Sequence, residues 1–329
     1  MSQLVDTFGR AITYLRLSVT DRCDFRCVYC MAEEMTFVPR SDVLSFEELA
    51  LVARAFVELG VTKIRLTGGE PLIRKDIIHA VEKIAAIEGL KSLCLSTNAS
   101  KLSDHASSLK AAGVDRINVS LDSLQPDKFR QLTRTGDVNK VIAGIDAAIN
   151  AGFVGLKINA VILRGRNDDE ILDLVDFARQ RHIDVCFIEE MPLGSISEHD
   201  RSLAFMPSAD IREVIATRHR LSPISDSTGG PSRYFAMPDS ASRIGFISPH
   251  SDNFCGHCNR VRVTAEGTLI LCLGNENAVD LRQIIRDNDH PLPLLKQAIC
   301  AAMAYKPAKH HFDLDAPVDI VRFMNATGG

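Results

Sequence analysis

The sequence predicts an α/β fold, a partial (β/α)6 barrel of the TIM type followed by a C-terminal extension. Short β-rich runs alternate six times with helix-like stretches, which implies a parallel sheet with right-handed crossovers. Six units are too few for a closed eight-stranded barrel, so a partial barrel is favoured. Polar residues also gather where the predicted strands end, as they do around ligand sites in such folds.

The strands and helices are predicted from their apolar patterns. The predicted strands are short and β-rich, and they cover residues 12–19, 61–66, 92–96, 116–121, 154–163 and 184–189. The predicted helices carry apolar residues at spacings of three and four. They cover residues 45–59, 76–87, 103–111, 139–150 and 168–181, and the first begins with a capping box formed by Ser45 and Glu48.

Chemically useful residues follow the predicted strands in chain order. They are the cysteine string 23–30, the string Gly68-Gly69-Glu70-Pro71, Ser96-Thr97-Asn98, Ser120-Leu121-Asp122, Lys157 with Asn159, and Glu189-Glu190-Met191-Pro192. Because the carboxyl ends of parallel strands meet at one edge, the sequence predicts one site at the barrel mouth.

After Met191 the alternation stops, and a stretch rich in Gly, Ser and Pro occupies residues 225–232. We therefore expect a barrel over residues 1–194 and a smaller segment over residues 195–329 that covers the barrel opening.

The chain has no run of roughly 18 apolar residues and no basic-then-apolar start, so we expect a cytoplasmic protein without a membrane partner. A net charge of −4 gives no general attraction to nucleic acid, so an anionic ligand must be held by local cations.

Cys23, Cys27 and Cys30 form the first cysteine group, in the string CDFRCVYC. Three thiolates can hold three irons of a [4Fe–4S] cluster and leave the fourth iron open. Clusters that only carry electrons usually have four cysteine ligands, so an open iron indicates a site for substrate or cofactor. A zinc knuckle or a chance grouping in a loop are the alternatives.

Cys255, Cys258 and Cys272 form the second cysteine group, at the feet of a predicted hairpin that turns at Glu266-Gly267. The spacing fits a zinc site completed by His257, His250 or another nitrogen ligand, and it fits an iron–sulfur cluster equally well. The first cysteine group favours a second cluster.

Cationic residues lie within the predicted strands. Arg260 and Arg262 alternate with Val261 and Val263, so both guanidinium groups are expected on one strand face, where they suit phosphate. A solvated strand face is the plainer alternative. Three further cations sit among apolar neighbours, where an unpaired charge is costly: Arg16, Arg65 and Lys157. Together they imply a polyanionic ligand, with a nucleoside triphosphate as the natural candidate.

These motifs together resemble the GTP 3',8-cyclase family of radical S-adenosylmethionine (SAM) enzymes, lyases that act in molybdenum cofactor biosynthesis. The resemblance runs nearly end to end. It rests on LRLSVTDRCDFRCVYCM, IRLTGGEPLIRKD, INVSLDSL, KINAV, FIEEMPLG, NFCGHCNRVRVTAEGTLILCLG and the terminal Gly328-Gly329.

The resemblance implies a role for each motif. The first cysteine group would bind a SAM-cleaving [4Fe–4S] cluster, and the second a further [4Fe–4S] cluster whose open iron binds guanine. The expected SAM contacts are Tyr29, Gly69, Ser120 and Met191. The expected GTP contacts are Arg16, Arg65, Ser96, Lys157, Arg260, Val261 and Arg262. The expected catalytic residues are Arg260, Arg262, Gly328 and Gly329.

The implied reaction is a radical cyclisation. A 5'-deoxyadenosyl radical would remove hydrogen from ribose C3' of GTP, and the carbon radical would add to guanine C8. The product would be (8S)-3',8-cyclo-7,8-dihydroguanosine 5'-triphosphate, the first intermediate of the cofactor pathway. The resemblance further implies a reducing electron donor, a downstream cyclic pyranopterin monophosphate synthase and a homodimer. Two other functions stay open: a radical SAM peptide maturase with an auxiliary cluster, and a metal-binding scaffold without turnover.

Two features of the sequence stand apart from the rest. The family pattern TTNG is Ser96-Thr97-Asn98-Ala99 here, which keeps a hydroxyl at Ser96 but places alanine where the turn usually has glycine.

The second feature is the C-terminal tail, which would ordinarily be a frayed terminus. Because glycine has no side chain, Gly328-Gly329 can instead thread a narrow opening, and we expect it to reach the arginines of the site.

Overall fold

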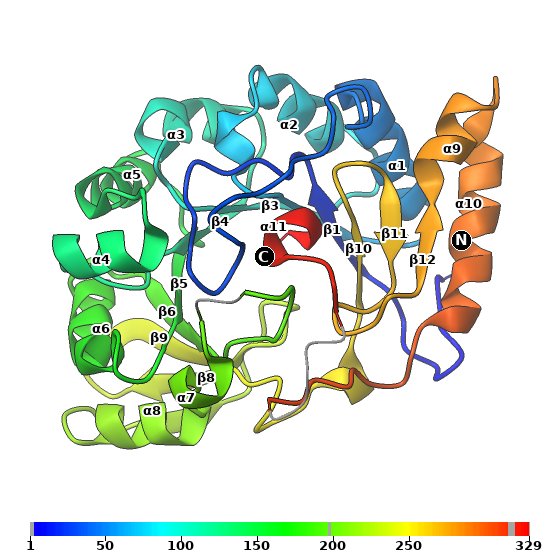
Figure 1. Ribbon diagram of the computed structural model, residues 1–329. Helices are drawn as coiled ribbons and strands as arrows, with labels where there is room; N and C mark the ends of the chain where they lie inside the picture. Colours follow the sequence, from blue (N-terminus) through cyan, green and yellow to red (C-terminus); the bar gives the residue numbers. More distant parts are fainter. Residues whose placement is uncertain (1–2, 197–198, 315–319, 329) are drawn as a thin grey trace.

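The computed structural model describes residues 3–196, 199–314 and 320–328, and it contains the predicted partial barrel (Figure 1). All six predicted barrel strands are present and neighbouring ones run parallel. They are β1 (Tyr14–Ser18), β2 (Lys63–Thr67), β3 (Ser92–Thr97), β4 (Arg116–Ser120), β5 (Lys157–Val161) and β6 (Asp184–Ile188).

Helices cover the outer face of the barrel strands in the order expected (Figure 1). They are α1 (Phe46–Glu58), α2 (Ile77–Ala85), α3 (Leu102–Ala111), α4 (Pro126–Thr133), α5 (Val138–Asn150) and α6 (Ile171–Gln180), with the 3-10 turns η1 (Pro71–Ile73) and η2 (Asp168–Glu170). The capping box of α1 is confirmed, since the Glu48 amide donates to Ser45 Oγ and the Ser45 amide donates to the Glu48 carboxylate. Helix α4 was not predicted, because only Phe129 and Leu132 supply large buried apolar side chains in its eight residues.

The C-terminal half continues the barrel sheet at both edges. Its strands are β7 (Ser222–Ile224), β8 (Arg233–Met237), β9 (Ser240–Ile247), β10 (Arg260–Val263), β11 (Thr268–Ile270) and β12 (Ala278–Asp280). Strand β10 pairs in parallel with β1, and β9 pairs in parallel with β6, which gives the order β12-β11-β10-β1-β2-β3-β4-β5-β6-β9-β8-β7. We expected this half only to cover the opening. Its strands also extend the sheet that forms the barrel wall. The division of the chain into two domains at residue 194 stays a prediction.

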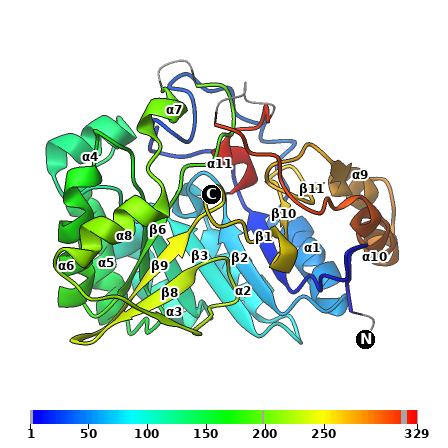
Figure 2. The ribbon, with the colours of Figure 1, turned by 90° about the horizontal axis from the view of Figure 1, so that it is seen from below.

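The remaining helices lie around these added strands. They are α7 (Arg201–Ala204), α8 (Ser208–Ala216), η3 (Cys255–His257), α9 (Leu281–Arg286), α10 (Pro291–Ala302), η4 (Met303–Tyr305) and α11 (Met324–Thr327). Helix α11 lies inside the ring of strands in one view and above their ends in the other (Figures 1 and 2). Within the described ranges, no helix combines the length and the apolar character needed to span a bilayer.

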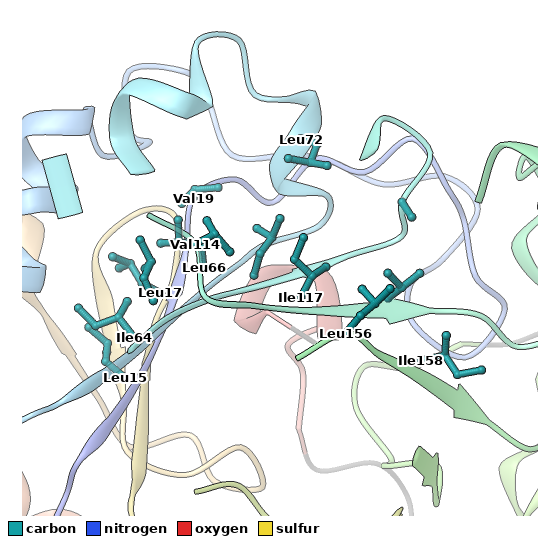
Figure 3. Close-up of a cluster of buried hydrophobic side chains, with 14 of the residues drawn as sticks. Leu15, Leu17, Val19, Ile64, Leu66, Leu72, Val114, Ile117, Leu156 and Ile158 are labelled. Carbon is teal, nitrogen blue, oxygen red and sulfur yellow. The ribbon is translucent and has the colours of Figure 1, made fainter. Parts of the chain in front are cut away.

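The hydrophobic core lies between the barrel strands and the helices. Figure 3 shows part of this layer, with Leu15, Leu17, Ile64, Leu66 and Ile158 among its side chains. These residues are fully buried, and they occupy every second position of their strands. Since side chains alternate across a strand, the intervening residues face the interior of the barrel.

The interior of the barrel is polar. The inward positions of β1, β2, β4 and β5 hold Arg16, Arg65, Asn118, Lys157 and Asn159. In a TIM barrel without an internal ligand, layers of branched apolar side chains fill this space. The strand pattern of this chain therefore leaves a polar cavity inside the sheet.

Candidate active site

The loop that carries the first cysteine group is held by the loop that follows β2. The Gly69 amide donates to Thr20 O at 2.8 Å, and the Glu70 amide donates to Arg22 O at 2.8 Å. A Cβ at Gly69 would collide with the carbonyl of Arg22. Glycine is needed at this position because the cysteine loop passes so close to its backbone.

The three thiols of the first cysteine group border one cavity, the first cavity. The residues expected to contact SAM border it too: Tyr29, Gly69, Ser120 and Met191, together with Ser96. Burial raises the pKa of Cys23, Cys27 and Cys30, and the carboxylates Glu70 and Asp122 raise those of Cys23 and Cys27 further. Thiolates in such surroundings need bound metal cations, which fits the three-cysteine ligand set of an iron–sulfur cluster.

Hydrogen bonds fix the wall of the first cavity. The Phe25 amide lies 3.4 Å from Cys23 Sγ, and Asn98 Nδ2 lies 3.7 Å from the same sulfur. The Tyr29 hydroxyl donates to Asp122 Oδ2 at 2.6 Å, so the aromatic ring has a set position beside the cysteines. Burial raises the pKa of Asp122 to about 6.

Glu70 is a buried carboxyl group next to the cysteine loop. It accepts hydrogen bonds from the amides of Leu72 and Asn98 and from the Thr97 hydroxyl. Burial raises its pKa to about 7, although these donors favour the charged form. Glu70 therefore ties the ends of β2 and β3 together directly below the first cysteine group.

The second cysteine group borders a second cavity. The predicted hairpin is confirmed, because β10 and β11 pair in antiparallel fashion with Cys258 before β10 and Cys272 after β11. This cavity also contains the cations predicted from the sequence, Arg16, Arg65, Lys157, Arg260 and Arg262. Val261 borders the cavity as well, but its side chain is buried in the core, so only its backbone can contact a ligand.

The arginines of the second cavity stand in one row across three strands. Arg16 of β1 is in register with Arg65 of β2 on one side and with Arg262 of β10 on the other. Burial, followed by repulsion from Arg16 and Arg260, lowers the pKa of Arg262 well below its usual value. Burial also lowers the pKa of Arg16 to about 10, where Tyr14 opposes the shift and Arg65 and Arg260 add to it.

In the described part of the chain, carboxylates do not pair with two members of this row, Arg65 and Arg262. No Asp or Glu there forms an ion pair with Arg65, Lys157, Arg260 or Arg262, and Arg260 Nε is buried without a hydrogen-bond partner. Like charges packed this closely are stabilised by an anion. The second cavity therefore has the charge of a phosphate-binding site.

Several cavity residues were absent from our sequence-based site. Tyr14 and Lys63 lie two positions before Arg16 and Arg65, and Asn118 lies two positions before Ser120. Because residues two apart share a strand face, the period-two pattern around each predicted residue could have found them. Asn159, which the sequence placed at the predicted site, borders both cavities.

The two cavities form one continuous interior. They share Asn118, Asn159, Ile188, Met191 and Met324 as lining residues. The predicted site at the barrel mouth is therefore only part of this interior. The second cavity extends to the opposite ends of the strands, because it reaches Tyr14, Lys63 and Lys157, the first residues of β1, β2 and β5. One cysteine group lies toward each end.

The C-terminal tail lies between the two cysteine groups. The Met324 amide donates to Cys30 O at 3.2 Å, and Asn325 Nδ2 donates to Asp21 O at 2.8 Å. Gly328 O accepts hydrogen bonds from Arg16, at 3.3 and 3.2 Å, and from Arg262. Gly328 has a φ of +76°, and a Cβ there would collide with the Thr67 hydroxyl, so only glycine fits. Gly329 lies outside the described residues.

The turn at residues 96–99 forms despite the alanine. Ala99 has a φ of +62° and is fully buried. The left-handed conformation costs an alanine roughly 1 kcal/mol. Ser96 Oγ lies 3.5 Å from Arg65 Nη1, so the hydroxyl borders the cationic row.

The histidines offered as zinc ligands do not complete the second cysteine group. His257 is exposed, and His250 Nε2 lies 2.9 Å from Glu190 O. Over the described ranges, no three His, Cys, Asp or Glu side chains converge on a single metal ion. Zinc would require such convergence, because its ligands all bind one atom within about 2.3 Å. A cubic cluster spreads its thiolates over three separate irons and fits three cysteines facing a cavity.

Family models cover most of the chain. Residues 17–178 match the radical SAM superfamily, and residues 183–312 match the family Molybdenum Cofactor Synthesis C. A GTP 3',8-cyclase of Marinobacter nauticus is 57% identical over 328 residues, which are 100% of this chain and 99% of that protein. A GTP 3',8-cyclase of Pseudomonas syringae pv. syringae is 60% identical over 327 residues, 99% of this chain and 98% of that protein.

A solved structure shares the fold. The crystal structure of Streptococcus suis SuiB bound to S-adenosylmethionine superposes with a TM-score of 0.59 at 16% sequence identity. The match covers 86% of this chain and 66% of SuiB, slightly under two thirds of that longer chain. At this identity the likeness concerns the fold, and it agrees with the partial barrel predicted from the sequence.

Replacing Gly69 tests the packing of the cysteine loop. We expect Gly69→Ala to push Arg22 away and to destabilise the metal-free protein by about 1–3 kcal/mol, the usual cost of overpacking. The amount of iron bound to the first cysteine group should also be lower in this variant. Gly256→Ala is the matched control, because nothing lies within 4 Å of a Cβ there. Urea unfolding and iron analysis give the result, and equal stability of the two variants would contradict it.

Tyr14 should make anion binding depend on pH. Burial raises its pKa, but Arg65, Arg16 and Lys63 together lower it to about 7. Above this pH the phenolate cancels one positive charge of the second cavity, so GTP affinity should fall, by up to about tenfold between about pH 6 and about pH 8. Tyr14→Phe should lose this pH dependence.

Anaerobic calorimetry with wild type and Tyr14→Phe measures this effect. The ratio of their dissociation constants cancels the ionisation of GTP itself. A ratio that does not change with pH would show that Tyr14 stays neutral in the cavity.

Proposed function

This chain belongs to the GTP 3',8-cyclase family of the radical SAM superfamily, and we propose that it converts GTP into (8S)-3',8-cyclo-7,8-dihydroguanosine 5'-triphosphate. The reaction is the first step of molybdenum cofactor biosynthesis. One observation carries the proposal: a continuous polar interior has a three-thiol group toward each end and a row of arginines, Arg65, Arg16 and Arg262, on neighbouring strands.

The first cysteine group is proposed to bind a [4Fe–4S] cluster and SAM. When bound, this cluster supplies the electron that cleaves SAM, and the resulting radical starts the reaction at ribose C3'. Tyr29, Gly69, Ser120 and Met191 border the space for SAM. The hydrogen bond from Tyr29 to Asp122 keeps the tyrosine ring in place as the cofactor enters.

The second cysteine group is proposed to bind a further [4Fe–4S] cluster that anchors guanine. Arg16, Arg65 and Lys157 would hold the triphosphate, with the Val261 backbone and the Ser96 hydroxyl as further contacts. A ligand fixed at both ends has few ways to move. Such fixing matters here because a primary carbon radical attacks any C–H bond within reach.

Arg260, Arg262, Gly328 and Gly329 are proposed to act directly in the cyclisation. Arg16 and Arg262 both donate to Gly328 O, which sets the direction of their guanidinium groups. A buried arginine that is already oriented stabilises developing charge without reorganising. The role of Gly329, which lies outside the described residues, is proposed from the family resemblance alone.

We further propose that the protein works in the cytoplasm as a homodimer with a reducing electron donor. The product would pass to cyclic pyranopterin monophosphate synthase. A peptide maturase, the alternative function, would bind a largely neutral main chain, and the uncompensated cations of the second cavity oppose it.

Cysteine variants test the division of labour between the two groups. Anaerobically reconstituted wild type should hold about eight irons and eight sulfides, and it should form 5'-deoxyadenosine and cyclised nucleotide from SAM and GTP. Cys27→Ala should abolish SAM cleavage. Cys258→Ala should keep uncoupled SAM cleavage and lose cyclisation, while Cys300→Ala, at an exposed free cysteine, is the matched control.

Chromatography of both products gives the result of this test. Cyclised nucleotide from Cys258→Ala at a near-normal rate would contradict the anchoring role. Stoichiometric zinc in anaerobically purified protein would overturn the second cluster.

Deleting Gly328 and Gly329 tests the tail. The metal content, the fold and the cleavage of SAM should stay near wild type, because α11 still binds the cysteine loop through Met324 and Asn325. Cyclisation should fall by about a hundredfold, the size of effect expected when reacting groups are misplaced. Val321→Ala, at an exposed position of the same tail, is the control. Unchanged cyclisation after the deletion would remove the tail from the active site.

A further inference from the structure

The side chain of Lys306 is buried beside the second cysteine group. Lys306 follows η4 and is 2% exposed. Its ammonium donates to Arg260 O at 3.0 Å and to Leu271 O at 2.5 Å. Leu271 immediately precedes Cys272, and Arg260 lies two residues after Cys258, so one ammonium group fixes the backbone next to two of the three cysteines.

Lys306 has no acidic partner in the described residues. No Asp or Glu there forms an ion pair with it, and its recorded hydrogen bonds end on neutral carbonyl oxygens. A buried ammonium group is costly unless a negative charge lies nearby. The groups that can supply this charge are the adjacent thiols, once they are ionised.

The ammonium group of Lys306 lies close to the sulfur of Cys258. Both contact the same carbonyl oxygen, since Lys306 Nζ lies 3.0 Å and Cys258 Sγ 3.9 Å from Arg260 O. A thiolate at Cys258 would therefore stabilise the buried ammonium group, and the ammonium group would stabilise negative charge on the sulfur in turn.

The first cysteine group has charges of both signs beside it. Asp24 Oδ1 lies 4.0 Å from Cys23 Sγ, and Asp122 borders the same cavity. The Arg26 guanidinium donates to Cys23 O at 2.6 Å. The two cysteine groups therefore differ, because acidic side chains accompany the cation at the first, whereas Lys306 stands beside the second without an acidic partner in the described residues.

We propose that Lys306 is a positioning residue and the countercharge of the second cluster, and that it raises the reduction potential of that cluster above the potential of the first. Reduction adds one electron, so a fixed positive charge nearby stabilises the reduced form. The inference rests on the proposed function in one respect, the presence of a cluster on the second cysteine group.

The experiment isolates the second cluster by replacing Cys23, Cys27 and Cys30 with alanine. In this background, Lys306→Gln removes the charge and keeps a donor, Lys306→Arg keeps the charge, and Lys309→Met removes an exposed lysine three residues away. Iron and sulfide analysis and an anaerobic redox titration followed by electron paramagnetic resonance are made on each protein.

We expect Lys306→Gln to disfavour the reduced cluster by at least tenfold, which is 59 mV for a one-electron couple. Lys306→Arg and Lys309→Met should stay close to the parent. In the otherwise unchanged chain, the second cluster should also titrate at a higher potential than the first. An unchanged potential in Lys306→Gln, with the cluster fully bound, would overturn the proposal.

If Lys306→Gln does not bind the cluster, the melting temperatures of the metal-free variant and its metal-free parent decide between two explanations. If metal-free Lys306→Gln melts with its parent, the lost charge acted on the cluster and the proposal stands. If it melts much lower, Lys306 is a structural residue and the proposal fails. A parent protein that binds no cluster in the triple-alanine background would instead refute the second cluster of the proposed function, and this is checked first.

Discussion

The alternation of apolar and polar residues along β1 and β2 is the constraint on which the rest of the structure depends. Leu15 and Leu17 face the helices, and Arg16 between them must therefore face the interior. The same holds for Arg65 between Ile64 and Leu66. Burying the apolar face against the helices thus forces positive charge into the barrel. The charge is tolerable in the folded protein because the interior remains a cavity that an anion can enter.

The C-terminal tail connects parts of the chain that the sheet alone would leave independent. Gly194 donates its amide to Ile320 O and packs against Phe323, so the loop after β6, which carries Met191, is joined to the tail. Further along, α11 binds the loop of the first cysteine group, and Gly328 contacts arginines of β1 and β10. The tail thereby contacts both the loop of the first cysteine group and the strand β10 that follows Cys258. A movement of one of these regions would be transmitted to the other through the tail.

The sequence predicts this fold well where the determinants are local. The alternation in β1 to β6, the capping box at Ser45 and the hairpin after Cys258 are all short-range patterns, and all are confirmed. The pairing of β10 with β1 joins residues far apart in the chain, and no local pattern reports it. Gly69 shows the same limit within the site, because its need for glycine arises from contact with the distant Arg22 carbonyl. Cys300 lies in the apolar run of α10 (Pro291–Ala302), where the sequence pattern favours burial, and yet it is exposed.

The charge difference between the two ends of the interior follows from what each end must hold. Carboxylates near the first cysteine group, Glu70 and Asp122, also form the hydrogen bonds that fix β2, β3 and Tyr29. Cations near the second cysteine group line the space for a polyanion. The phosphates of a highly charged nucleotide are therefore attracted to the cations of the second cavity more strongly than to the first cavity, where Glu70 and Asp122 oppose them. Charge alone thus favours the second cavity for the polyanion, and the space beside the first cysteine group stays available to another ligand.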